Sequence, residues 1–474
     1  MRQKLIYSLT GISTIGAASH FIHSKNESVP EGTSQELESF RCSLKKDYLQ
    51  TRSEAEKRAE AAVKRYMIVN GVPGVSVGVS VKSATVWQRG FGFSDVETNS
   101  PCTPHTVMRI ASISKSVTSA IAGKLIQSGK LDVDKSIYEY LPDFPKKKVD
   151  GEEVDITMRQ LMSHMSGVRH YPKKDEKNSD AKKEETNQKN DQLPTDQSSP
   201  KPNETVMKDR EEENQGPDSR YEEFHSNKKY DSVSAALELF KNDPLLHKPG
   251  TKFFYTTHGF TLVSAVLEKC AEKSFQVMVK ELCHELGLRN TSTDVKLGIV
   301  GNRSKYYRRN KHHKLEHTPE VDNSCKWAGG GLISNVEDLL IFGNAMLYSS
   351  QSTSGSSPRA FLQRETILKL FNSEVLMPTK THGPNVYHYG LGWQKVEAVP
   401  QVGGTPENRA AGYIFHSGAA VGASSILLIK PISNAPKDSG KAEGVCVAVL
   451  SNLQDSGHGI IALALELADI FKID

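Results

Sequence analysis

Hydrophobic residues alternate with polar or small ones near both ends of the chain, a pattern typical of β-strands. Near the beginning, the runs 71–81 and 84–95 are rich in valine and aromatic residues. They predict an antiparallel hairpin with its turn at Lys82 and Ser83. Near the end, strands are expected at 387–396, 411–419, 422–431 and 444–452, followed by a helix at 459–473.

Helical spacing of apolar residues dominates the middle of the chain. It predicts helices at 53–69, 107–128, 156–168, 232–240, the second half of 248–274, and 327–347. Expected N-caps are Ser53, Thr157 and Ser334. Because two strand-rich ends flank a helical middle, we expect an α+β fold. Both ends would share one antiparallel sheet, and the middle would form a helical lobe.

The chain divides into three kinds of segment. Residues 1–52 are expected to be a targeting segment and linker, and 53–474 one domain. Within it, 53–111 and 327–474 would form the α/β part and 112–326 the helical lobe. An insertion at 173–228 is expected to be disordered, because 23 of the 48 residues in 173–220 are charged and none is aromatic.

The first 26 residues suggest targeting. They contain Arg2, Lys4 and Lys25, several hydroxyl residues, and no acid before Glu27. This composition favours a mitochondrial presequence. Because residues 5–22 are largely uncharged, a secretory signal or short membrane anchor stays an alternative, as does an ordinary N-terminus.

Composition and cysteine spacing argue against a few classes of partner and site. The formal charge of +4 comes from 60 basic and 56 acidic residues, so no nucleic-acid partner is expected. The six cysteines show no C-x-x-C pair and no metal-ligand rhythm with histidines, which predicts free thiols and no metal site. Met162, His164 and Met165 are interpreted as core or loop residues rather than ligands.

Candidate chemistry begins in the helix at 107–128, which is expected to bury one face. Ser112 and Lys115 are three residues apart, so their side chains share a face of this helix. A lysine surrounded by apolar residues loses its proton more easily than one in water, and a neutral amine beside a hydroxyl forms a nucleophile with its base. Ser-x-x-Lys occurs at least four more times, so a serine cap below a solvated lysine is the alternative.

A second candidate group is the triplet Tyr255-Thr256-Thr257, where an extended segment meets a helix. Such junctions are common places for active-site side chains. The alternatives are that Tyr255 only anchors a core hydroxyl and that Thr257 only packs.

These segments together resemble the serine β-lactamase and penicillin-binding-protein superfamily. The resemblance rests on A-S-I-S-K-S at 111–116, L-M-S-H-M-S-G-V at 161–168, Y-T-T at 255–257 and F-H-S-G at 415–418. It is strongest to the class C and esterase branch and, within that, to a mitochondrial group of animals. It covers roughly residues 55–474 without the insertion.

The resemblance implies roles for matching residues. Ser112 would be the acylated nucleophile, Lys115 its base or proton relay, and Tyr255 a partner in proton transfer. The backbone N–H groups of Ser112 and Ala419 would form the oxyanion hole. Thr257, His416, Ser417 and Ala419 would line the substrate site.

Two positions depart from the superfamily pattern. Thr257 stands where an asparagine is usual, so it lacks an amide to hold a substrate amide. His416 replaces the lysine of a Lys-Thr-Gly motif, and a histidine is largely neutral near pH 7. It could also be a satisfied strand histidine. β-Lactam hydrolysis is therefore not the expected biological reaction.

The sequence thus predicts a serine hydrolase that forms an acyl-enzyme on a peptide or small acyl substrate, with no metal or organic cofactor. The resemblance favours a mitochondrial peptidase. An esterase or β-lactamase is an alternative, as is a protein that self-assembles into oligomers or filaments on the same fold. Membrane proximity through the N-terminus is a further expectation.

Overall fold

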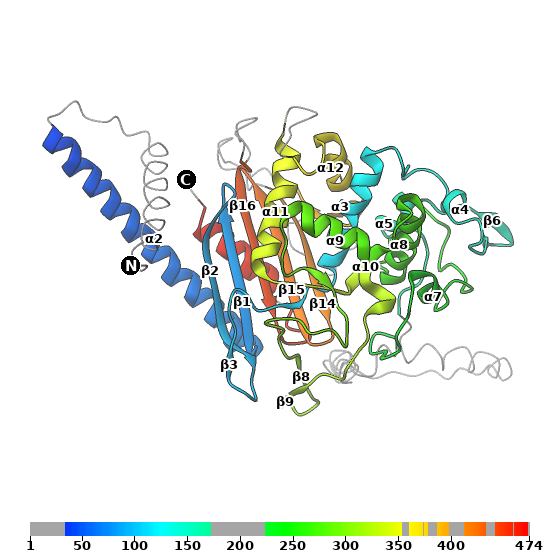
Figure 1. The fold of residues 1–474 in the computed structure, drawn as a ribbon, viewed down its shortest axis with the longest axis horizontal. Helices are drawn as coiled ribbons and strands as arrows, with labels where there is room; N and C mark the ends of the chain where they lie inside the picture. The colour runs from blue at the N-terminus through cyan, green and yellow to red at the C-terminus, as the bar shows by residue number, and fades with distance from the viewer. Residues whose placement is uncertain are drawn as a thin grey trace, which may run out of the picture.

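A nine-stranded antiparallel sheet, counted over the described strands, runs through the centre of the protein (Figure 1). The computed structural model describes residues 34–171, 223–352, 360–372, 374–377, 386–397, 412–432, 441–457 and 459–472, with only the backbone for 34–49. The strand order is β11 (Val375–Leu376), β12 (Tyr387–Tyr389), β13 (Gln394–Val396), β14 (Tyr413–Ala420), β15 (Ala423–Pro431), β16 (Gly444–Ser451), β1 (Gly74–Val81), β2 (Ala84–Asp95) and β3 (Ser100–Pro101). Because β16 pairs with β1, the two ends of the chain share the sheet, as predicted.

The predicted hairpin of β1 and β2 is confirmed. Its turn residues Lys82 and Ser83 have φ values of 49° and 66°, which matches the twist of the two flanking strands. Valines at alternate positions of β1 pack into one core, whereas Gly78 faces the opposite side, where an added Cβ would lie 2.8 Å from Leu340. The small residues between the valines therefore allow a helix to approach the sheet.

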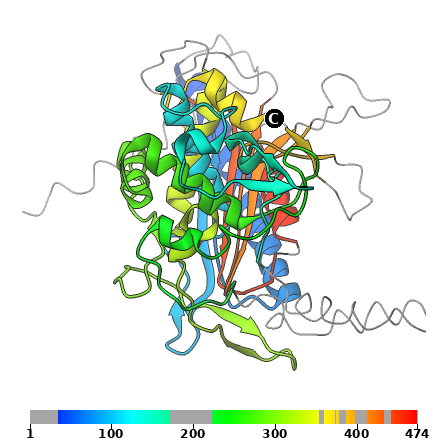
Figure 2. The ribbon, with the colours of Figure 1, turned by 90° about the vertical axis from the view of Figure 1, so that its right-hand side faces the viewer.

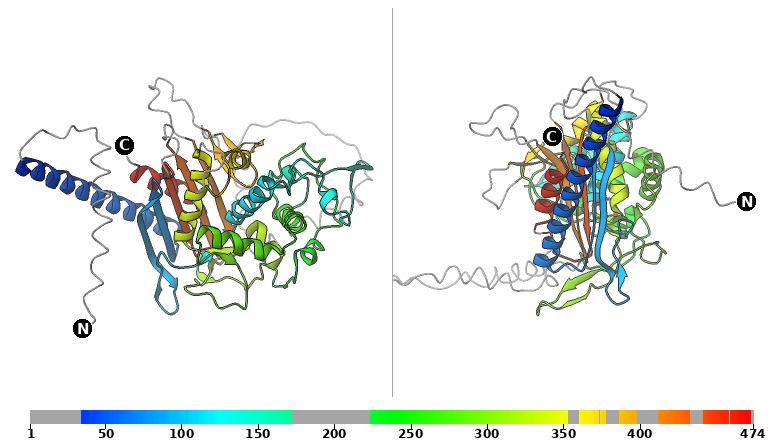
Figure 3. Two further views of the ribbon diagram at one scale, coloured as in Figure 1. Left: turned by 45° about the horizontal axis from the view of Figure 1, so that its top comes forward. Right: turned by 90° about the vertical axis from the view of Figure 1, so that its left-hand side faces the viewer.

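Helices cover both faces of the sheet (Figures 1 and 3). On one face, α2 (Ser34–Asn70) lies beside α13 (Ile460–Ile470), and they enclose one hydrophobic core. On the other face, α11 (Val336–Gln351) packs on β1, β15 and β16. Beyond α11 lies the helical lobe, with α3 (Ile113–Gln127), α4 (Ile137–Tyr140), α5 (Met158–Met162), α7 (Val233–Leu237), α8 (Thr257–Ala271), α9 (Phe275–Leu286), α10 (Trp327–Gly330) and α12 (Arg364–Phe371).

Short strands complete the described structure. A three-stranded sheet joins β4 (Met108–Arg109), β10 (Leu332–Ser334) and β7 (Ser292–Thr293), and two hairpins are formed by β5 (Lys147–Val149) with β6 (Glu152–Val154) and by β8 (Tyr307–Arg309) with β9 (Leu315–His317). The second hairpin projects from one end of the molecule (Figure 2). Within the described ranges, no helix has the length and apolar character needed to cross a bilayer.

Helix α3 is buried on all sides, not on one face as predicted. Twelve of its fifteen residues are buried, because α8, α9, α10, α12 and the sheet surround it. Its hydroxyl side chains reach backbone carbonyls of neighbouring segments: Ser116 donates to Gly392 and Thr118 to Ala328. These bonds let a polar sequence occupy the interior.

Several expected helix boundaries are wrong. The helix expected at 107–128 begins at Ile113, after β4, and the helix expected at 156–168 ends at Met162. Helix α2 begins at Ser34 rather than Ser53, so part of the expected linker is helical. Neither glycine nor proline occurs from Ser34 to Asn70, and the helix ends before Gly71, which has a φ of 62°. The N-cap of α11 is Asn335, whose side chain accepts from the Asp338 N–H, while the expected cap Ser334 is the last residue of β10.

The predicted insertion at 173–228 lies mostly outside the described residues, but its last part, 223–228, is ordered. Glu223 accepts hydrogen bonds from Arg169 and pairs with Nε2 of His258 at 2.8 Å. Burial opposes ionisation of Glu223, but the bonds from His258 and Arg169 lower its pKa to about 2. These ion pairs order the segment, so we place the end of the insertion before Glu223.

Candidate active site

Ser112 stands at the start of α3 with its hydroxyl uncommitted to the helix. It is the N-cap residue, yet its side chain makes no capping hydrogen bond. The preceding residue, Ala111, has a φ of 48°, a sparsely populated conformation for a residue with a side chain. Strain of this kind often marks functional sites. The interpretation of Ser112 as a simple cap is therefore wrong.

Lys115 places its amine beside this hydroxyl. Its Nζ lies 3.1 Å from Ser112 Oγ and donates to the carbonyl of Gly329, and the side chain is fully buried. The ring centroids of Tyr255 and Phe260 lie 4.7 and 5.5 Å from Nζ. Burial lowers the pKa of Lys115 well below its ordinary value. Burial therefore favours the free amine, which can accept a proton, over the ammonium form.

Tyr255 completes the group of three side chains. It lies just before α8, and its phenol shares a hydrogen bond with Ser112. Burial raises the pKa of Tyr255, although the bond with Ser112 opposes the rise. The phenol is therefore protonated at neutral pH. The structure thus brings together the hydroxyl, amine and phenol that the sequence singled out.

The start of α8 depends on two histidines that the sequence reasoning did not assign to the site. The Thr256 N–H donates to Nδ1 of His164 at 3.2 Å, and the Thr257 N–H donates to Nδ1 of His170 at the same distance. A ring nitrogen that accepts is unprotonated. Burial, followed by repulsion from Lys115, lowers the pKa of His170 to about 3 and that of His164 well below its ordinary value.

Strand β14 presents an open backbone edge near Ser112. Strand β13 pairs only with Tyr413–Phe415 in the described structure, so the stretch from His416 onward has no strand on that side. Ala420 and Ala423 close a two-residue turn, so the alternation of an antiparallel ladder directs the Ala419 N–H toward this open edge. An added Cβ at Gly418 would lie 2.8 Å from Ala111 Cβ. Close packing there brings β14 to the turn that carries Ser112.

The other expected binding residues differ in exposure. Ser417 is half-buried and Ala419 exposed, whereas His416 is fully buried. The two ring nitrogens of His416 lie 2.7 Å from the carbonyl of Ser417 and 2.9 Å from the hydroxyl of Tyr389. Burial and, secondarily, Lys115 lower the pKa of His416 to about 3. His416 is therefore a neutral, fully partnered histidine.

Thr257 is also largely enclosed. It is 6% exposed, and its hydroxyl shares a hydrogen bond with Tyr171. Its methyl group packs where a Cβ on Gly329 would approach to 2.7 Å. Sequence patterns did not indicate the hydrogen-bond partners of Thr257 and His416. Tyr171 directly precedes the charged insertion, and Tyr389 belongs to an aromatic strand.

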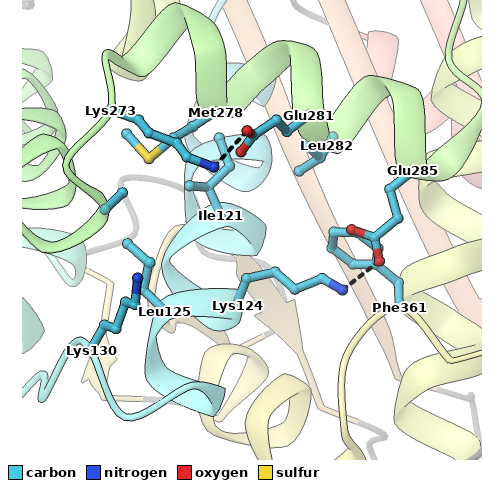
Figure 4. A pocket seen from close by; sticks show the side chains of 11 residues that line it. Ile121, Lys124, Leu125, Lys130, Lys273, Met278, Glu281, Leu282, Glu285 and Phe361 are labelled. Atoms are coloured by element: carbon cyan, nitrogen blue, oxygen red, sulfur yellow. Dashed lines mark hydrogen bonds and ion pairs between the residues drawn. The ribbon is translucent and has the colours of Figure 1, made fainter.

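A separate cavity of about 240 Å³ lies against the C-terminal half of α3 (Figure 4). Its apolar floor includes Leu125 and Leu282, and two ion pairs, Lys124–Glu285 and Lys273–Glu281, lie at its sides. None of the candidate site residues lines it. Within the described residues, no group of three or more histidine, cysteine, aspartate or glutamate side chains could hold a metal ion.

A Ser–Lys–Tyr group between an antiparallel sheet and a helical lobe defines a serine hydrolase with the β-lactamase and transpeptidase-like fold. The family model described as Beta-lactamase matches residues 59–469. The chain belongs to the Beta-lactamase family, as its resemblance predicted.

Curated relatives show high similarity over most of the chain. The chain is 36% identical to the human "Serine beta-lactamase-like protein LACTB, mitochondrial" over 425 residues, covering 84% of this chain and 76% of that one. The mouse protein of the same name is 37% identical, with 84% and 77% covered.

Solved structures share the fold at lower identity. An octameric penicillin-binding protein homologue from Pyrococcus abyssi has a TM-score of 0.60 at 22% identity, covering 86% of this chain and 77% of that one. EstCE1, described as a hydrolase with promiscuous acyltransferase activity, has a TM-score of 0.62 at 19% identity, covering 88% and 98%. A class C β-lactamase has a TM-score of 0.59 at 16% identity, covering 89% and 98%.

The neutral histidines predict a stability that falls with acidification. His164, His170 and His416 have pKa values lowered from 6.5 in the folded protein, so only the unfolded chain gains these protons just below pH 6.5. Their contribution is complete above about pH 6.5 and is lost below it, toward pH 3 for His170 and His416, at up to about 1.4 kcal/mol per pH unit for each histidine. Urea unfolding between pH 7.5 and about 5 measures this slope.

The matched variants are His416→Gln and His312→Gln, the latter at an exposed position. His416→Gln should flatten the slope, because an amide has no proton to gain, whereas His312→Gln should leave it unchanged. Equal slopes for His416→Gln and the unaltered protein would contradict this account.

Proposed function

We propose that the protein hydrolyses amide or ester bonds through an acyl-enzyme on Ser112. The observation that carries the proposal is the buried amine of Lys115, with a lowered pKa, at 3.1 Å from Ser112 Oγ. Among the described residues Lys115 has no carboxylate within ion-pair distance, so no counter-charge there offsets the burial that disfavours its charged form. A lone pair next to a hydroxyl activates that hydroxyl as a nucleophile.

Each group has a step that it can perform. Lys115 Nζ takes the Ser112 proton as Oγ bonds to the substrate carbonyl carbon, and the N–H groups of Ser112 and Ala419 stabilise the resulting oxyanion. Tyr255, whose phenol is protonated, donates to the leaving group as the carbonyl–leaving-group bond breaks, and Lys115 restores the phenol proton. Water then attacks the ester by the reverse proton path and releases the acid.

The site favours acyl groups without a carboxylate beside the scissile bond. His416 is neutral and both of its nitrogens are engaged, so it offers no cation to such a group. The open edge of β14 from His416 to Ala420 can instead pair with an extended backbone, as peptide segments do at sheet edges. A peptide is therefore the substrate class that we propose, and an ester is the alternative.

Labelling of Ser112 tests the chemistry. A fluorophosphonate probe should modify the intact protein at Ser112, and Ser112→Ala should abolish this. Tyr255→Phe should slow labelling by about 100- to 10,000-fold, the usual effect of removing a general acid–base group. Ser128→Ala, at the other end of α3, is the control and should label normally. Absence of labelling in the unaltered protein would refute the proposal.

A lysine at position 416 tests the substrate class. His416→Lys places an amine where the family pattern has one, so acylation by a carboxylate-bearing β-lactam should rise about 10- to 100-fold relative to a neutral ester. His416→Gln, which stays neutral, should not change this ratio. If the ratio is already high in the unaltered protein, the assignment of a neutral substrate is wrong.

We also infer a mitochondrial location, because the curated relatives from human, mouse and cattle are all named mitochondrial. Fractionation of cells that express the full chain should recover the protein with mitochondria. Recovery in the secreted or plasma-membrane fraction would favour the alternative interpretation of residues 1–26, a secretory signal or short membrane anchor.

Self-assembly stays a prediction. An octameric penicillin-binding protein homologue shares the fold at 22% identity. Sedimentation at micromolar concentration would distinguish a monomer from a larger assembly.

A further inference from the structure

His164 holds the backbone on both sides of Tyr255. The Phe254 N–H donates to the His164 carbonyl at 2.8 Å, and the Thr256 N–H donates to the His164 ring at 3.2 Å. The backbone groups on either side of Tyr255 are therefore fixed by one residue that lies about 90 positions earlier in the chain. Small rotations of this backbone would move the phenol relative to Ser112.

The His164 ring also covers Tyr255. The two ring centroids are 4.2 Å apart, and His164 is fully buried. Tyr389 lies 4.6 Å from the same imidazole on another side. These contacts restrict the direction in which the Tyr255 ring can turn, and they keep water away from it.

The conformation of His164 is unusual in two respects. Its φ is 61°, in the left-handed region that histidine and asparagine tolerate better than most residues. Its Nδ1 accepts a hydrogen bond from the Thr256 N–H, so the hydrogen of the neutral ring is on Nε2, which has no hydrogen-bond partner among the described atoms. An unpartnered buried N–H is costly. The residue is therefore not explained by its contribution to the core.

We propose that His164 is a positioning residue for the reaction: in its neutral form it sets the Tyr255 phenol against Ser112 by accepting a hydrogen bond from the Thr256 N–H and packing against the phenol ring. This role rests on the proposed acyl-enzyme function of Ser112. His164 itself contacts neither substrate nor the reacting atoms, and it acts through the orientation of Tyr255.

Two amide substitutions separate the hydrogen bond from the ring. In His164→Asn the side-chain oxygen occupies the position of Nδ1, and asparagine tolerates the positive φ. In His164→Gln the amide extends toward the position of Nε2, so the Thr256 N–H loses its acceptor. Both variants lack the ring, so the difference between them isolates the hydrogen bond.

The readout is the rate at which a fluorophosphonate labels Ser112. His164→Gln should slow labelling by about 100-fold, since displacement of a reacting group by about 1 Å has an effect of this size. His164→Asn should retain a rate about 10-fold or more above that of His164→Gln. His258→Gln, at an equally buried histidine of α8, controls for general loosening and should stay within about threefold of the unaltered protein.

A double-mutant cycle tests whether the effect passes through the phenol. In a Tyr255→Phe background, His164→Gln should slow labelling by less than about threefold, because the group that it positions is absent. Full additivity of the two changes would overturn the proposal, as would equal rates for His164→Asn and His164→Gln. If the unaltered protein labels and His164→Gln labels at the same rate, only this inference fails. If the unaltered protein does not label at all, the proposed function fails with it.

Discussion

An uncompensated lysine amine in the interior is the constraint on which the site depends. An ammonium ion at a position with no exposed surface and no counter-charge is strongly disfavoured, so burial lowers the pKa of Lys115 and favours its free base. The same enclosure explains why α3 is surrounded on every side. Its partners are acceptors and ring faces: the Gly329 carbonyl, Ser112 Oγ, and the rings of Tyr255 and Phe260.

The fold joins this amine to the rest of the site through contacts distant in sequence. Ser425 on β15 donates to the Ile110 carbonyl, just before the turn that presents Ser112, and Gly418 on β14 lies against Ala111. The sheet contributes these strands from the C-terminal part of the chain, and the lobe contributes Tyr255. The site therefore forms only when the two parts have packed together.

Local pattern was sufficient for several elements and for choosing Ser112 and Lys115 as candidates, whereas the role expected of Tyr255 came from the family resemblance. The alternating valines of β1, the turn at Lys82, and the Thr157 cap follow from short-range rules, and the structure has all three. Ser112 and Lys115 stood out because an apolar helix follows them. The start of α2 was missed because a polar linker and an exposed helix have similar compositions.

The sequence did not reveal the partners that decide protonation and orientation. His164 and His170 reach the start of α8 from about 90 residues away, and no spacing rule connects a histidine to a backbone N–H at that separation. His416 was expected to be neutral. Its hydrogen bond with Tyr389, however, comes from β12, which lies two strands away from β14 in the sheet. Such pairings come from tertiary packing, which residue patterns do not encode.

The chain leaves the described structure at Tyr171 and returns at Glu223, and both residues contact His258: the ring centroids of Tyr171 and His258 are 5.1 Å apart, and Glu223 lies 2.8 Å from Nε2. The chain therefore leaves and rejoins the helical lobe beside one histidine. A reporter domain inserted between these two residues would have both of its ends at the same place on the lobe.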